Sequence, residues 1–148
     1  MKKEMTTDIR VESGDWATLG GECESVRFEV FVDEQGVPEE LELDEDDPRS
    51  VHFVAKDAAG RVIGCARLLP DGHIGRLAVR KSHRGCGAGG RILAAVLECA
   101  RSAGFARVVL NAQTHAQGFY ERYGFEAEGE VFLEAGIEHV TMTKVLGG

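Results

Sequence analysis

Residues 84–90 read R-G-C-G-A-G-G, and this glycine-rich stretch decides the fold. Gly85, Gly87 and Gly90 match G-x-G-x-x-G, the pattern of a dinucleotide-binding turn. Glycines between a strand and a helix leave backbone N–H groups open at the positive end of the helix, and their missing side chains let a pyrophosphate come close. The stretch therefore predicts a phosphate cradle, and its surroundings must decide for which ligand.

The segments on either side of the glycines predict a strand–turn–helix–strand unit. We expect a strand over residues 73–80, a helix over 88–103 with apolar residues at three- and four-residue steps, and a strand over 106–111. Gly104 is typical of a helix end. Such a βαβ unit pairs its two strands in parallel through a right-handed crossover.

The other elements complete a mixed α/β domain in which an antiparallel meander joins the βαβ crossover. Alternation, helical periodicity and turn residues predict strands over 9–12, 50–57 and 61–69, helices from Asp15 to about Gly36 and over 116–123, and a hairpin of 126–134 with 137–145. The 148 residues are expected to form one domain, residues 1–148, with a core of about 8–146.

The residues after the glycine stretch disfavour a nicotinamide dinucleotide. A Rossmann unit places an acidic residue about 20 residues further on, at the end of the next strand, to bind the ribose. Here that strand ends at Asn111, and no Asp or Glu lies between Cys99 and Tyr120. The predicted antiparallel strands also differ from a Rossmann sheet. A P-loop is ruled out because the glycines lead into no Gly-Lys-Ser/Thr.

Two blocks together resemble the GNAT superfamily of N-acetyltransferases. Residues 84–89 are similar to its R/Q-x-x-G-x-G/A acyl-CoA motif, which also lies between a strand and a helix. Asn111 with residues 116–125 (A-Q-G-F-Y-E-R-Y-G-F) is similar to the family's N…A-x-x-F/L-Y-E-K/R-x-G-F signature. The stretch F-V-D-E-Q-G-V-P-E-E (31–40) resembles the small bacterial ElaA/YjcF-like branch. The resemblance implies a GNAT acyl-CoA N-acyltransferase fold.

The resemblance implies acetyl-CoA as cosubstrate and no metal. Backbone N–H groups of the glycine stretch would hold the pyrophosphate, Arg84 would add a charge contact, and a backbone N–H of the preceding strand would face the thioester oxygen. Asn111 ends the strand after the helix, where its side chain can reach the cofactor, and a role as a turn-forming residue at the strand end is nearly as consistent with the sequence. The implied cofactor-binding residues are Leu77, Ala78, Val79, Arg84, Gly85, Cys86, Gly87, Ala88, Gly89, Asn111 and Phe119.

Tyr120 is the general acid that the resemblance implies, because a phenol near the sulfur can protonate the departing thiolate. An aromatic residue at helical spacing can also be simple core packing. The general base is not identified: Glu34, His52 and His73 are candidates, and each is also consistent with a structural or solvated role. Cys86 is interpreted as a small turn residue, since direct transfer needs no acyl-enzyme.

The expected function is acetyl transfer from acetyl-CoA to a primary amine of a small molecule or peptide, by direct attack in a ternary complex. The alternative is a catalytically silent acyl-CoA-binding or sensing module. The sequence identifies neither the acceptor amine nor the oligomeric state, and it leaves a homodimer open.

Composition sets further expectations. The 17 basic and 25 acidic residues give a formal charge of −8, which disfavours nucleic-acid binding. The four cysteines form no Cys/His cluster, so neither zinc nor a disulfide framework is expected. No signal peptide or membrane-length apolar run is present, so we expect a cytoplasmic protein without a membrane partner. Residues 39–47 (E-E-L-E-L-D-E-D-D) predict an exposed loop that could steer a cationic amine.

Overall fold

The computed structural model describes residues 8–42 and 44–147 of the chain. The strands are β1 (Arg10–Gly14), β2 (Val51–Lys56), β3 (Val62–Leu68), β4 (His73–Val79), β5 (Arg107–Gln113), β6 (Glu126–Glu134) and β7 (Ile137–Val145). The α-helices are α2 (Trp16–Arg27), α3 (Glu39–Glu42), α4 (Ala88–Ser102) and α5 (Gln117–Glu121). Short helical turns are η1 (Phe28–Glu34), η2 (Asp47–Arg49), η3 (Lys81–His83) and η4 (Thr114–Ala116).

The strands form one mixed sheet in the order β1-β2-β3-β4-β5-β7-β6. The meander β1–β4 is antiparallel, β4 and β5 are parallel, and the final hairpin inserts β7 between β5 and β6. The predicted fold class is therefore confirmed, including the parallel pair that the βαβ unit requires. The hairpin also has the predicted bounds.

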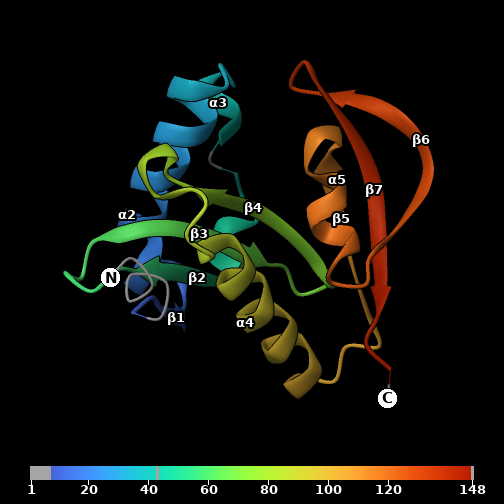
Figure 1. Ribbon diagram of the computed structural model, residues 1–148, viewed down its shortest axis with the longest axis horizontal. Coiled ribbons are helices and arrows are strands. Elements are labelled where there is room, and N and C mark those ends of the chain that lie inside the picture. The colour runs from blue at the N-terminus through green and yellow to red at the C-terminus, as the bar shows by residue number, and fades with distance from the viewer. Residues whose placement is uncertain (1–7, 43, 148) are drawn as a thin grey trace.

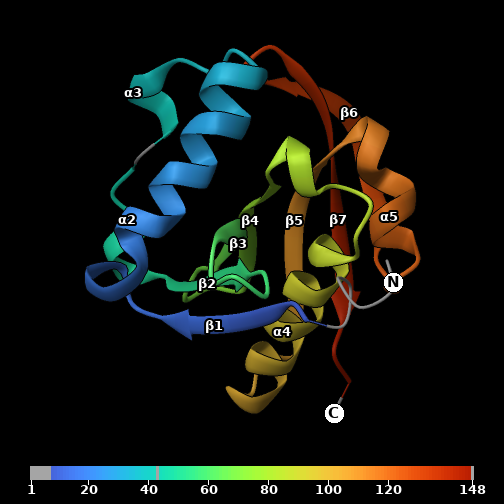
Figure 2. The ribbon, with the colours of Figure 1, turned by 60° about the vertical axis from the view of Figure 1, so that its left-hand side comes forward.

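Helices α2 and α4 cover opposite faces of the meander (Figures 1 and 2). Alternate residues of β2 explain this arrangement, because Phe53 and Ala55 pack in the larger core with α4, whereas Val54 packs in a second core with α2. Successive side chains of a strand point to opposite faces, so one apolar strand serves both cores. No helix in the described part of the chain is long and apolar enough to cross a membrane.

Strands β4 and β5 touch at one end only (Figure 1). Their ladder is limited to His73 with Val109 and Ile74 with Leu110. Directly after Ile74, Arg76 takes a φ of +53°, and the register of β3 with β4 shifts nearby, which marks a bulge. Bulges bend a strand and end its pairing. The edge of residues 77–79 therefore diverges from β5.

The predicted helix after Asp15 has a more complex form. Asp15 caps it as expected, because its Oδ1 accepts a hydrogen bond of 2.9 Å from the Thr18 N–H. The α-helix ends at Arg27, and residues 28–34 continue in a π-helical turn that ends near Gly36, whose φ is +76°. Helix α2 and η1 together thus run from the sheet's far side to the open end of β4.

The prediction of an exposed acidic loop over 39–47 is wrong at both ends, because residues 39–42 form helix α3 and Asp47 is buried. Asp47 is 2% exposed, and its carboxylate accepts hydrogen bonds from Arg27 on α2 (2.9 and 3.0 Å) and from Arg67 on β3 (2.9 Å). Asp44 accepts from Arg67 at 2.7 and 2.9 Å and from Arg76 at 3.3 Å. These partners come from distant elements, so the local run of acids could not show them. We call these five residues the arginine–aspartate network.

Candidate active site

The main cavity lies where β4 diverges from β5, and its volume is about 1380 Å³. Its walls come from η1, β4, the loop before α4, β5, α5 and β7. The structure brings together the following predicted site residues as lining: Glu34, His73, Leu77, Ala78, Val79, Arg84, Gly85, Gly87, Ala88, Gly89, Asn111, Phe119 and Tyr120. Among the predicted cofactor-binding residues Cys86 is the exception, since its Sγ turns back to donate to the His83 carbonyl at 2.8 Å.

The glycine loop leads into α4 with its backbone exposed to the cavity. Gly85 and Gly87 have φ values of +86° and +90°, in the left-handed region that disfavours side chains. Gly87 is the N-cap of α4 and carries no capping side chain, so the first-turn N–H groups are left for another acceptor. The macrodipole of a 15-residue helix adds positive potential at this point. The arrangement suits an anion.

Aromatic rings of α5 and of the turn after it lie close to the first turn of α4. Phe119 lies 5.1 Å from Tyr120 and 5.3 Å from Tyr123, measured between ring centroids. A Cβ added at Gly90 would lie 2.2 Å from the Tyr123 hydroxyl oxygen, so only glycine allows this close approach. The glycines of residues 84–90 therefore open the loop to a ligand and also seat α5.

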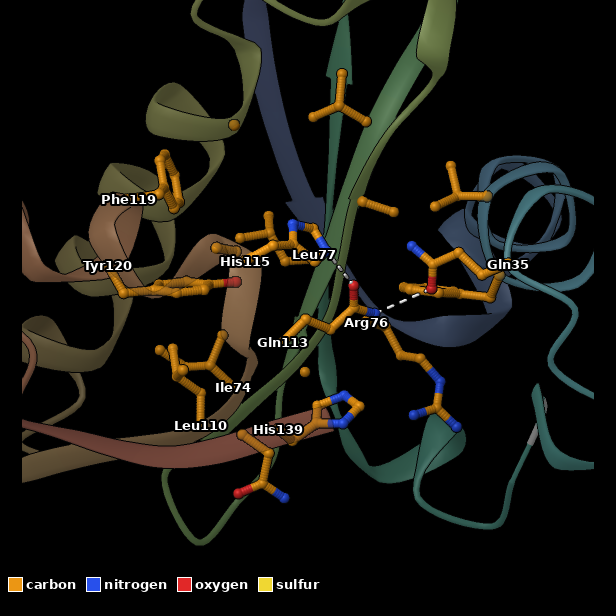
Figure 3. A pocket seen from close by; sticks show the side chains of 18 of the residues that line it. Gln35, Ile74, Arg76, Leu77, Leu110, Gln113, His115, Phe119, Tyr120 and His139 are labelled. Carbon is orange, nitrogen blue, oxygen red and sulfur yellow. Dashed lines mark hydrogen bonds between the residues drawn. The ribbon is translucent and has the colours of Figure 1, made fainter. Parts of the chain in front are cut away.

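Tyr120 presents its hydroxyl to the cavity (Figure 3). Its ring packs on Phe125, with centroids 5.9 Å apart, and against the larger core. Burial raises the pKa of Tyr120 to about 12. The phenol is therefore protonated at neutral pH and can act as a hydrogen-bond or proton donor toward an atom in the cavity.

Arg84 and Glu34 form a bidentate ion pair beside the glycine loop. The Arg84 Nη1 and Nη2 atoms donate to the Glu34 carboxylate at 2.6 and 2.7 Å, and its Nε donates to the Val79 carbonyl at 2.9 Å. The hydrogen bond from Arg84 holds the pKa of Glu34 below its ordinary value. The guanidinium thus ties the loop to η1 and β4, and Glu34 is a charged, paired carboxylate rather than an open base.

The two candidate histidines lie in different surroundings. His73 is at the rim of the cavity, with a side chain 51% exposed and its Nδ1 3.0 Å from Asp71. His52 is fully buried beneath α2, where its Nε2–H donates to the Asp47 carbonyl at 2.8 Å. His52 does not line the cavity, so the candidate base on β2 is placed away from the predicted cofactor residues.

Several polar cavity residues escaped sequence reasoning. His115 donates through Nε2 to Gln113 Oε1 at 2.7 Å, and Gln113 donates to Gln35 Oε1 at 2.9 Å, which joins η4, β5 and the end of η1 across the cavity (Figure 3). Arg76 and His139 also line it. The usable signal was alternation: on β5, Asn111 and Gln113 face away from the core that Leu110 and Ala112 enter.

The remaining predicted residue, Asn111, is held in place by β7 and β6. Its Oδ1 accepts from Thr141 at 3.0 Å, and its amide donates to Glu134 at 3.4 Å. The side chain is thus directed along the polar face of β5, beside the cavity.

Comparisons with known proteins agree with this geometry. The model of the acetyltransferase (GNAT) domain matches residues 19–146. An uncharacterized N-acetyltransferase, YjcF of Bacillus subtilis, is 43% identical over 123 residues, which cover 80% of this chain and 87% of the relative. An acyl-CoA N-acyltransferase from Pseudomonas aeruginosa superposes with a TM-score of 0.81 at 32% identity, covering 93% of this chain and 99% of the other.

The structure of Escherichia coli ElaA superposes equally well. Its TM-score is 0.81 at 28% identity, over 92% of this chain and 99% of the other. The resemblance to the ElaA/YjcF-like branch is confirmed by these relatives. The glycine loop before α4, the free edge of β4 and the Tyr120 hydroxyl meet in one cavity. This geometry agrees with the match to the GNAT domain over most of the chain, and the match establishes that this protein belongs to the GNAT family of acetyltransferases.

Proposed function

We propose that the protein transfers the acetyl group of acetyl-CoA to a primary amine of a small molecule or peptide, by direct attack in a ternary complex. The GNAT family implies acyl-CoA binding, and the acetyl donor and amine acceptor are our proposal. One observation carries it: the glycine loop, the open edge of β4 and the Tyr120 hydroxyl meet in a single cavity.

The described residues fit coenzyme A. Gly85 has no described atom within 4 Å of a hypothetical Cβ, so this part of the loop faces open space. Left-handed glycines such as Gly85 and Gly87 are typical of backbone turns whose N–H groups bind anions. The loop and the first turn of α4 would hold the diphosphate. The unpaired edge of Leu77–Val79 offers backbone groups to an extended arm. Both segments line the same cavity.

Bound acetyl-CoA would supply an acetyl group activated as a thioester. A backbone N–H on the open edge of β4 would donate to the carbonyl oxygen and stabilise charge that develops there. Tyr120 would donate its phenolic proton to the sulfur. Arg84 would hold the glycine loop in position through its hydrogen bonds to Glu34 and to the Val79 carbonyl, which is a positioning role.

The alternative is an acyl-CoA-binding module without catalysis. One observation favours it: of the three candidate bases, Glu34 is paired with Arg84, His52 lies outside the cavity, and His73 is half exposed at its rim beside Asp71. A catalytic protein needs another group to deprotonate the amine.

Two measurements separate these functions. Thermal unfolding with acetyl-CoA, CoA or NAD tests the ligand, and we expect acetyl-CoA and CoA, but not NAD, to raise Tm. Thiol release from acetyl-CoA is then followed with spermidine, benzylamine and a tripeptide amine. Amine-dependent release supports the transferase. Stabilisation without release on any amine would favour the binding module, and stabilisation by NAD alone would contradict both.

A further inference from the structure

The cavity has two halves when it is divided by the unpaired edge of β4. The donor half contains the glycine loop and α5, including Arg84, Phe119 and Tyr120. The acceptor half contains the end of η1, the bulge of β4 and the facing parts of β5 and β7, and its residues include Gln35, Arg76, Gln113 and His139. If the proposed function holds and the donor occupies the first half, the amine must enter through the second.

His139 is a buried histidine in the acceptor half (Figure 3). It is 8% exposed, stands opposite Gln113 in the β5–β7 ladder, and stacks on Phe132 with ring centroids 6.0 Å apart. These contacts hold the ring on the cavity wall. Its position depends on the pairing of three strands, β5, β7 and β6, rather than on a mobile surface loop.

The hydrogen bond of His139 determines which ring nitrogen can accept a proton. Its Nδ1 lies 2.7 Å from the carbonyl oxygen of Ile137. A carbonyl only accepts, so Nδ1 carries the hydrogen, and in the neutral ring Nε2 keeps its lone pair. A histidine whose tautomer is set in this way has an accepting nitrogen available for a substrate proton.

The other histidines that line the cavity are placed less favourably. His73 is half exposed at the rim and contacts Asp71. His83 belongs to the donor side, next to the glycine loop, and contacts Ser82 through Nδ1. His115 is exposed and donates to Gln113. Of the histidines described along this cavity, His139 alone combines burial with a carbonyl-bound Nδ1.

We propose that His139 is the general base of the reaction and that its Nε2 removes a proton from the acceptor ammonium. Over the whole transfer one C–N bond forms and one C–S bond breaks, and the ammonium loses two protons. One proton passes to Nε2 and then to solvent. The other replaces the proton that Tyr120 gives to the sulfur, so the products are the amide, the free thiol and one released proton.

Other ionisable side chains face this region and must be separated from His139 in a pH profile. They are Glu134 on β6, His115 on η4, His73 and Arg76 in β4, and Asp44 in the segment between α3 and η2. The His139→Asn variant addresses the base specifically, because its amide nitrogen can keep the donor to Ile137 while the accepting Nε2 is lost. Variants His73→Asn and Glu134→Gln, profiled in parallel, show whether either group accounts for the pH dependence of kcat/KM.

The experiment compares kcat/KM for the amine between pH 6 and 9.5 in wild type and His139→Asn. We expect a loss of about 100-fold or more at pH 7, since general base catalysis contributes about 10²–10⁴-fold. The loss should shrink to a few-fold near the amine's own pKa, where bulk solvent supplies the neutral amine. Acetyl-CoA binding, measured by calorimetry, should be retained. An equal loss at every pH would indicate a structural role and overturn the proposal.

A second readout needs no turnover. Long-range ¹H–¹⁵N spectra should show that the neutral form of the His139 ring carries its hydrogen on Nδ1, and an Nε2–H tautomer would overturn the assignment. If wild type releases no thiol with any amine, the proposed function fails and the base assignment fails with it. If wild type turns over and His139→Asn matches it, or His73→Asn alone is impaired, only the base assignment fails.

Discussion

Replacing Asp47 with alanine tests whether the arginine–aspartate network holds the acceptor wall of the cavity together. The Asp47 carboxylate accepts from Arg27 twice, from Arg67, and from the Asp44 N–H at 3.3 Å. Arg27 is 1% exposed, and its guanidinium also lies 5.4 Å from the Trp16 ring centroid. Removing the carboxylate leaves this buried cation without the charge of Asp47.

The expected cost comes from that burial. Removing one partner of a buried ion pair destabilises by about 3–5 kcal/mol. The entropy of unfolding is about 2.1 cal/mol/K per residue, which for 148 residues corresponds to about 0.3 kcal/mol per degree. We therefore expect Asp47→Ala to lower Tm by about 10–15 °C. Asp46→Ala is the matched control, because Asp46 is partly exposed and pairs with the exposed Arg49. It should cost at most about 0.5 kcal/mol.

The pH dependence of the same pair of proteins provides a second check. Burial opposes the charge of Asp47, but Arg27 and Arg67 outweigh it and hold its pKa below 3.8. A carboxyl with a lowered pKa stabilises the fold above its unfolded pKa, and this contribution disappears as pH falls through the folded value. The Tm gap between wild type and Asp47→Ala should therefore be constant above about pH 5 and close toward pH 2.

Calorimetric or fluorescence unfolding scans from pH 7 to pH 2 give both quantities. A Tm loss for Asp47→Ala no larger than that of Asp46→Ala would refute the reasoning, because it would mean that Arg27 finds solvent or another partner at little cost. A gap that stays constant down to pH 2 would refute the electrostatic origin of the loss.

The remaining predictions concern the donor half. Tyr120→Phe should lower kcat about 100-fold and leave the acetyl-CoA Kd within about 2-fold. Because the pKa of Tyr120 is about 12, the pH profile of the wild-type kcat should show no decrease near pH 10 from this group. Such a decrease would count against the assignment. Gly87→Asp should weaken acetyl-CoA about 10-fold more than the isosteric Gly87→Asn, since both side chains tolerate positive φ and only Asp repels a diphosphate; equal Kd values would contradict a phosphate cradle. Gly90→Ala should lower the free energy of unfolding by about 1–3 kcal/mol. Adding Tyr123→Phe should restore stability, because the new Cβ would lie 2.2 Å from the Tyr123 hydroxyl oxygen but 3.4 Å from its Cζ. Unfolding midpoints of the single and double variants test this prediction.

Local patterns in the chain predicted most of the fold. The apolar stripe of residues 88–103 and the alternation over 50–80 depend on the periods of helix and strand, so they can be read without tertiary information. The parallel pairing of β4 and β5 was predicted from the order strand, glycine turn, helix and strand, which is a βαβ unit. The glycine stretch was informative because Gly85 and Gly87 take a left-handed backbone conformation that disfavours side chains.

Only part of the site could be predicted from the sequence, because some of its features depend on local patterns and others on contacts between distant segments. By itself, the sequence determined the mixed sheet, the glycine-rich start of α4 and the placement of Tyr120 in the helix after β5, because all three follow from periodicity and turn residues in neighbouring segments. Only the tertiary structure decided that Glu34 pairs with Arg84, that Asp47 is buried between two arginines, and that His139 on the last strand faces the cavity. These three arrangements depend on charges and hydrogen-bond acceptors from distant segments, and no local sequence pattern indicates which distant segments come into contact.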